Sequence, residues 1–88
     1  MRDICFTSVA FEEYSDWAIE SKKIQQKLKK LIVECERTPF EGTGKPEGLK
    51  HNLKGLWSRR ITDEHRLVYK VTDDMITIVS CRDHYEDK

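Results

Sequence analysis

The sequence predicts an α+β fold in which two N-terminal helices pack on a mainly antiparallel sheet of four or five strands. Apolar residues recur at helical spacing between positions 10 and 35. After position 56, three short apolar segments are separated by turn-type clusters, as in an antiparallel meander. A chain of 88 residues is long enough for one core, so we expect residues 1–88 to form a single domain.

The first helix is predicted to follow a short segment, residues 1–6, whose apolar positions are compatible with a strand. Thr7 and Ser8 are each a plausible N-cap for this helix. The residues at helical spacing that we expect to face the core are Ala10, Tyr14, Trp17 and Ala18.

The second helix shows a longer apolar stripe, and Ser21 can cap its start. Its expected core-facing residues are Ile24, Leu28, Leu31, Ile32 and Cys35. Thr38 precedes Pro39, and the residue before a proline disfavours the α region. The helix should therefore end by about Arg37.

A long loop and three strands make up the rest of the prediction. Both prolines and all four glycines lie within residues 39–55, and loops of this length are often functional. The predicted strands are residues 57–62, 66–71 and 75–81. In the second of these, Leu67, Tyr69 and Val71 alternate with Arg66, Val68 and Lys70, so one face can pack on the helices while the other presents cations.

The charge of the chain is balanced overall but uneven along it. Sixteen Lys and Arg oppose sixteen Asp and Glu, which argues against bulk DNA wrapping. Residues 21–70 nevertheless carry thirteen positive and six negative charges, a net of +7, which fits either a polyanion patch or a solvated helix surface. No secretory signal or membrane-length apolar run is legible, so we expect a cytoplasmic protein. Three cysteines without a CxxC pair suggest reduced, mostly buried thiols.

Two familiar ligand motifs are excluded by their spacing. The glycine-rich segment 42–48 resembles a phosphate loop, but Pro46 follows Lys45 where a Ser or Thr is required. Its glycines can instead permit turns or let the backbone approach another chain closely. Among the His and Cys residues only Cys81 and His84 are closely spaced, whereas structural zinc sites need paired short spacings, so we expect no metal.

The remaining polar groups suit metal-free RNA cleavage. RNA carries its own nucleophile, the 2′-hydroxyl, which attacks the adjacent phosphate once a base removes its proton and an acid protonates the leaving 5′-oxygen. A carboxylate in the long loop, cations in two strands and a histidine near the end of the chain could supply these functions. The alternative is that each is an ordinary surface residue.

A family resemblance favours the catalytic interpretation. The segments 37–42, 44–47, 49–53, 57–61, 64–69 and 81–85 read RTPFEG, GKPE, LKHNL, WSRRI, EHRLVY and CRDHY. This order of landmarks closely resembles the YoeB/Txe family, which comprises toxins of bacterial toxin–antitoxin pairs. The resemblance spans nearly the whole chain and is densest over residues 37–85.

The resemblance implies a fold, an activity and partners. The family is similar in fold to RelE-type ribonucleases, with two helices on a twisted, mainly antiparallel sheet. Its members are mRNA interferases, endoribonucleases that cut messenger RNA in the ribosomal A site without a cofactor. The resemblance also implies a YefM/Phd-type antitoxin, operator DNA bound only through the antitoxin complex, and a homodimer.

Site residues follow from the same resemblance. It implies that Glu47 is the general base, that Arg66 stabilises the scissile phosphate, that His84 is the general acid and that Tyr85 helps to position the phosphate or a base. Lys50 and Arg60 match further cations expected to hold the RNA backbone, and we assign Lys45 and His51 to RNA binding with them.

Several alternatives remain open at this level. Arg66 could pair with Glu64 or Asp63 across its turn, and the protein could be a non-catalytic inhibitor that only occupies the ribosome or RNA. His84 shares strand phase with core-facing Ile76 and Ile78, so a bulge or strand end near Ser80 is required. Aromatic residues that we expect in the core or at an interface, rather than stacking on bases, are Tyr14, Trp17, Trp57 and Tyr69.

Overall fold

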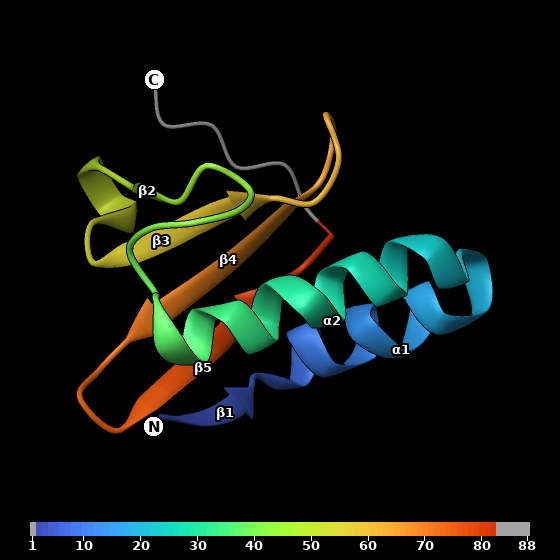
Figure 1. Ribbon diagram of the computed structural model, residues 1–88, viewed down its shortest axis with the longest axis horizontal. Coiled ribbons are helices and arrows are strands. Elements are labelled where there is room, and N and C mark those ends of the chain that lie inside the picture. Colours follow the sequence, from blue (N-terminus) through green and yellow to red (C-terminus); the bar gives the residue numbers. More distant parts are fainter. Residues whose placement is uncertain (1, 83–88) are drawn as a thin grey trace.

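The protein is a five-stranded mixed sheet with two helices packed on one face, as the computed structural model shows for residues 2–82 (Figure 1). Helix α1 spans Ser8–Glu20 and helix α2 spans Lys22–Arg37. The strands are β1 (Asp3–Phe6), β2 (Glu47–Gly48), β3 (Leu56–Arg60), β4 (Arg66–Val71) and β5 (Met75–Ser80). In the sheet their order is β1-β5-β4-β3-β2, and a 3₁₀ turn at His51–Leu53 follows β2. The predicted fold class is confirmed.

Both helices begin at the predicted caps. The Thr7 hydroxyl accepts a hydrogen bond from the Ala10 N–H at 3.1 Å, and the Ser21 hydroxyl accepts one from the Ile24 N–H at 3.3 Å. Helix α2 ends at Arg37 as expected and buries Leu28, Leu31, Ile32 and Cys35. One core assignment is wrong: Ala18 is exposed, because the core-facing side of α1 is narrow and buries only Ala10 and Trp17.

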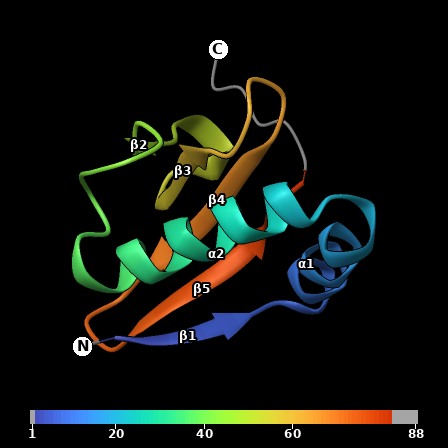
Figure 2. The same ribbon diagram turned by 45° about the vertical axis from the view of Figure 1, so that its right-hand side comes forward.

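The sheet combines the predicted meander with one parallel strand. Strands β3, β4 and β5 pair antiparallel in sequence order, whereas β1 pairs parallel to β5 with Ile4 opposite Ile76. Figure 2 shows β1 beside β5 at one edge of the sheet and β2 beside β3 at the other. The two ends of the described chain therefore meet in the sheet.

The two faces of the sheet differ in chemistry. The helix-covered face contributes Leu67, Tyr69, Ile76 and Ile78 to the core, all 0% exposed. Because side chains alternate along a strand, Arg66, Val68 and Lys70 lie on the opposite face, which we call the open face. Lys70 is exposed there, as the prediction of cations on this face requires, whereas Val68 is fully buried.

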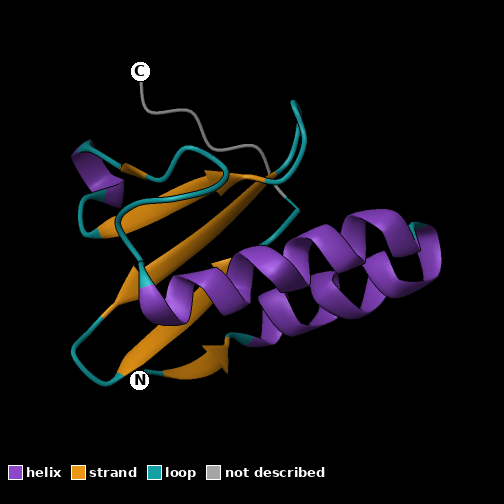
Figure 3. Cartoon of the chain, viewed as in Figure 1, coloured by secondary structure: helices purple, strands orange, loops and turns teal. Residues whose placement is uncertain are grey.

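The predicted irregularity near Ser80 is confirmed. Val68 pairs with Ser80 and Tyr69 pairs with Ile78, so Val79 is an extra residue on β5, which then ends at Ser80. Helix α1 holds the following residue: the Cys81 N–H donates to Glu13 at 2.8 Å, and the Trp17 indole N–H donates to the Cys81 carbonyl at 2.9 Å. Figure 3 shows this helix pair beside the strands.

The predicted core aromatics and cysteines mostly occupy the interior. Trp17 and Tyr69 are buried, and Tyr14 and Trp57 pack against the core. Cys35 and Cys81 are buried, whereas Cys5 is exposed. Within residues 2–82, neither helix is long and apolar enough to cross a membrane.

Candidate functional site

The open face brings three of the predicted site residues to the same side of the sheet. Glu47 of β2 lies opposite Ser58 of β3, and Arg60, two residues further along β3, lies opposite Arg66 of β4. Residues that pair directly across strands, and those two apart on one strand, share a face. Glu47, Arg60 and Arg66 therefore project from the face that the helices leave open.

The spacing of these residues follows from sheet geometry. Glu47 and Arg66 are two strands and two residues apart, which corresponds to about 12 Å between their Cα atoms. Both side chains are long, so a group placed between them lies within reach of each. Glu47 and Arg60 are exposed, and Arg66 is half-buried.

Arg66 is held by its own turn in a specific way. Its Nη1 donates to the carbonyls of Thr62 at 2.9 Å, Asp63 at 3.2 Å and His65 at 3.3 Å. Backbone carbonyls, rather than the carboxylates of Glu64 or Asp63, are thus its hydrogen-bond partners within residues 2–82. All of these bonds use Nη1, and within residues 2–82 Nε and Nη2 donate to no other group.

The other predicted cations divide into two groups. Lys45 lies beside the end of β3, where the Arg60 N–H donates to the Gly44 carbonyl at 2.7 Å. Lys50 and His51 lie instead near the start of β3, since the Leu49 N–H donates to the Leu56 carbonyl. Four residues of strand, about 13 Å, separate the Leu56 end from the Arg60 end. The structure thus brings Lys45 to Arg60 but not Lys50 or His51, and His84 and Tyr85 lie outside the described residues.

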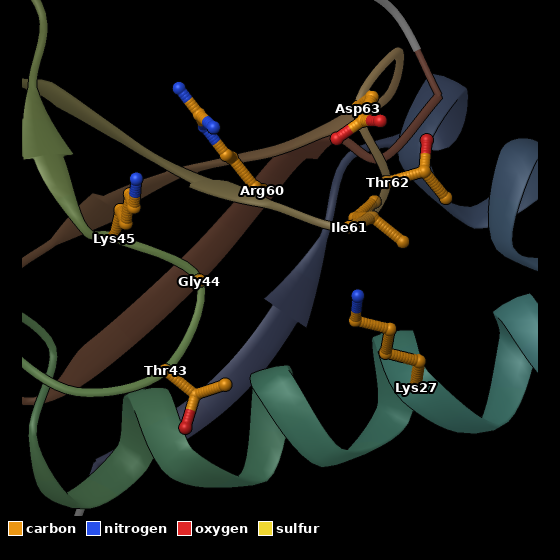
Figure 4. A pocket seen from close by; sticks show the side chains of 8 residues that line it. All are labelled: Lys27, Thr43, Gly44, Lys45, Arg60, Ile61, Thr62 and Asp63. Atoms are coloured by element: carbon orange, nitrogen blue, oxygen red, sulfur yellow. The ribbon is translucent and has the colours of Figure 1, made fainter.

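A shallow depression adjoins Lys45 and Arg60. It has a volume of about 270 Å³ and lies between α2, the loop before β2 and the turn after β3 (Figure 4). Its lining residues are Lys27, Thr43, Gly44, Lys45, Arg60, Ile61, Thr62 and Asp63. In Figure 4, Lys45 and Arg60 point away from α2, whereas Lys27 extends from α2 toward Ile61.

A buried arginine that the sequence analysis did not single out organises the loop beside the site. Arg59 is 0% exposed and forms an ion pair with Glu34 of α2. Its guanidinium also donates to the carbonyls of Thr38, Thr43 (3.0 Å) and Glu41 (2.9 Å), and its Nε donates to the Tyr69 hydroxyl at 3.2 Å. Arg59 lies two residues after Trp57, which was predicted to be in the core. Strand alternation could therefore have predicted that Arg59 faces the helices.

The ionisation states of the residues around Arg59 are consistent with its role in holding the loop. Burial raises the pKa of the Tyr69 hydroxyl to about 12 and that of the Cys35 thiol to about 11, so both stay neutral. Desolvation opposes ionisation of Glu34, but hydrogen bonds from Thr43 and Arg59 outweigh it and hold the pKa of this carboxyl below its ordinary value. The Tyr69 hydroxyl donates to the Pro39 carbonyl at 2.6 Å, so it too holds the loop.

The described residues offer no ready metal site. Among residues 2–82, no three His, Cys, Asp or Glu side chains are grouped closely enough to hold an ion. What the open face presents is one carboxylate and several cations at one end of the sheet. Such a face can bind an anionic chain and accept a proton beside it.

Comparison with known proteins identifies the family. Residues 6–85 match the model described as the YoeB-like toxin of bacterial type II toxin–antitoxin system. Toxin YoeB of Escherichia coli K12 is 54% identical over 82 residues, which is 93% of this chain and 98% of that protein.

Solved structures agree. The YoeB/ParE toxin from Agrobacterium tumefaciens superposes with a TM-score of 0.91 at 40% identity, covering 94% of this chain and 99% of that one. The YoeB dimer from Staphylococcus aureus gives a TM-score of 0.89 at 47% identity and covers 96% and 98% of the two chains. The fold and these likenesses define a class, the small α+β toxins of bacterial toxin–antitoxin systems. Within this class, the chain belongs to the YoeB-like family.

Proposed function

We propose that this protein is a ribosome-dependent endoribonuclease, an mRNA interferase that cleaves messenger RNA in the ribosomal A site and so inhibits translation. The observation that carries the proposal is the register of β2, β3 and β4, which gives the open face of the sheet a carboxylate, Glu47, and two arginines, Arg60 and Arg66. Membership in a toxin family supports it.

The proposed reaction is an internal transesterification. Glu47 accepts the proton of the ribose 2′-hydroxyl, whose oxygen then attacks the adjacent phosphorus. Arg66 compensates the negative charge that gathers on the phosphorane, and Arg60 and Lys45 hold the neighbouring backbone. His84 donates a proton to the departing 5′-oxygen while Tyr85 helps to position the phosphate. The products are a 2′,3′-cyclic phosphate and a 5′-hydroxyl end, and no metal or cofactor takes part.

The proposed partners follow from the relatives. The S. aureus YoeB has been solved in complex with YefM, and that complex superposes on this chain with a TM-score of 0.87 at 46% identity. We therefore expect a YefM-type antitoxin to neutralise this protein, operator DNA to be bound only through that complex, and the toxin itself to form a homodimer like the S. aureus dimer.

The decisive test separates cleavage from occupancy. In a purified translation system, a Glu47→Gln, His84→Gln double variant should lose at least about 10²-fold in cleavage rate, since each acid–base group contributes about 10²–10⁴, while ribosome binding persists. Glu41→Gln, which makes the same charge change in the same loop, is the matched control. Mapped 5′ ends should be in-frame and carry hydroxyls. Undiminished translational arrest by the double variant would favour a non-catalytic inhibitor, and a divalent-metal requirement would refute the mechanism.

A further inference from the structure

Three cations from separate parts of the chain line the depression beside Arg60. Lys27 comes from α2, Lys45 from the loop before β2 and Arg60 from the end of β3, against the single carboxylate of Asp63. Within residues 2–82, none of these three cations has an ion-pair partner, whereas Arg59 and Arg82 are paired with Glu34 and Glu20. The site therefore has a local excess of about two positive charges available to a ligand.

Specific hydrogen bonds hold the loop that forms one wall of the depression. Glu34 accepts hydrogen bonds from the Thr43 N–H at 2.7 Å and the Thr43 hydroxyl at 3.0 Å, and Arg59 binds the Thr43 carbonyl. The Arg60 N–H then ties Gly44 to β3. A Cβ at Gly44 would lie 3.0 Å from the Arg60 carbonyl oxygen, so glycine is what lets the loop lie this close to the strand.

The depression shares one residue, Arg60, with the open face. Arg60 lines it and lies directly opposite Arg66, and like charges in this cross-strand position repel unless an anion lies between them. An anionic chain crossing the Arg60–Arg66 pair would meet Lys45 and then Lys27 as it passes over Gly44. A row of cationic side chains fits a polymer of phosphates better than a single small anion.

We propose that this depression is a binding subsite for a phosphodiester group of the RNA strand next to the scissile one, with Lys27 of α2 as an RNA-binding residue. The inference rests on the proposed function, because it assumes that RNA crosses the open face. It extends the RNA path from the sheet onto a helix. Lys27 does not take part in the chemistry and acts by holding the strand.

The test measures RNA binding without cleavage. Binding of a short single-stranded RNA to the Glu47→Gln protein is followed against salt concentration, where removal of one lysine–phosphate interaction reduces the slope of log K on log salt by about 0.7. Lys27→Gln should reduce the slope by about this amount. Lys29→Gln, the same change on the same helix but outside the depression, should leave it nearly unaltered.

A neutral phosphate locates the contact. A methylphosphonate is placed at each position of the RNA in turn. At the position that contacts Lys27, it should weaken RNA binding to the protein that retains Lys27 but should not weaken binding to Lys27→Gln. Equal slope changes for Lys27→Gln and Lys29→Gln would overturn the inference, as would a methylphosphonate effect that is the same in both proteins. Weaker binding of a poly-glutamate peptide with RNA binding unchanged would assign the depression to an acidic protein instead.

The two proposals can fail separately. If the wild-type protein cleaves RNA but Lys27→Gln does not alter RNA binding, only the subsite proposal is refuted. If Lys27 contacts RNA but the wild-type protein does not cleave it, only the endoribonuclease proposal is refuted.

Discussion

Two adjacent arginines illustrate how completely strand position sets the role of a side chain. Arg59 lies on the helix-covered face and is buried among Glu34, Tyr69 and loop carbonyls, whereas Arg60 lies on the open face and is exposed. Residue type does not distinguish them, but strand alternation does, because Arg59 is in phase with Trp57 and Arg60 is not. The partners of Arg59 could not have been predicted, because Glu34 is 25 positions away and the loop carbonyls carry no sequence signal.

Removing the Arg59 guanidinium should destabilise the protein strongly. Arg59→Met leaves Glu34 without its ion-pair partner and several loop carbonyls without their donor, so we expect the free energy of unfolding to fall by about 3–5 kcal/mol. Tyr69→Phe removes only the hydroxyl and should cost about 1–3 kcal/mol. Urea denaturation measures both.

Arg82→Met is the contrasting control. Arg82 pairs with Glu20 at 2.6 Å, but both side chains are about a third or more exposed, at 34% and 46%. The loss should be about 1 kcal/mol or less. Equal destabilisation by the Arg59 and Arg82 variants would show that the buried position confers no special stability.

Among the elements, those with a strong local pattern were predictable and those defined by distant partners were not. Helix α2 ends where Pro39 requires, and β4 has the predicted bounds because alternation and flanking turn residues mark it. The two-residue β2 was assigned to a loop, since only its pairing with Ser58 and Trp57 makes Glu47–Gly48 a strand. The same pairing brings Glu47 to the open face, so site geometry depended on the least predictable element.

The contact between the loop and β3 can be tested with paired glycines. Gly44 and Gly55 both have positive φ, +86° and +100°, but a Cβ would meet β3 only at Gly44 and nothing within 4 Å at Gly55. Gly55→Ala should therefore cost only the backbone strain, about 1–2 kcal/mol. Gly44→Ala should cost more and should also weaken RNA binding, because Lys45 shifts relative to Arg60. Thermal unfolding and RNA titration measure the two effects, and similar losses in both variants would contradict the tight crossing.

The stability of the whole protein should decrease at alkaline pH. Burial raises the pKa of Cys35 from 9.0 to about 11 and that of Tyr69 from 10.0 to about 12. The folded protein keeps these protons when the unfolded chain has already released them. The contribution of these two groups to the free energy of unfolding is therefore fully present below about pH 9 and falls as the pH rises, by at most about 1.4 kcal/mol per pH unit for each group.

Cysteine variants isolate one part of this dependence. Urea denaturation at about pH 8 and about pH 10 should show a smaller decrease for Cys35→Ala than for the unaltered protein. Cys5→Ala, at an exposed position, should keep the full decrease. An unchanged decrease in Cys35→Ala would rule out the buried thiol as a source.

The parallel pairing of β1 with β5 has a consequence for how the protein is made. Residues 3–6 are synthesised well before residues 75–80, which are their only strand neighbour within the described chain. Such long-range closure delays folding until both segments are available. A toxin built this way has an incomplete sheet while the intervening residues are being translated, so the polypeptide reaches its complete fold only after the ribosome has passed β5.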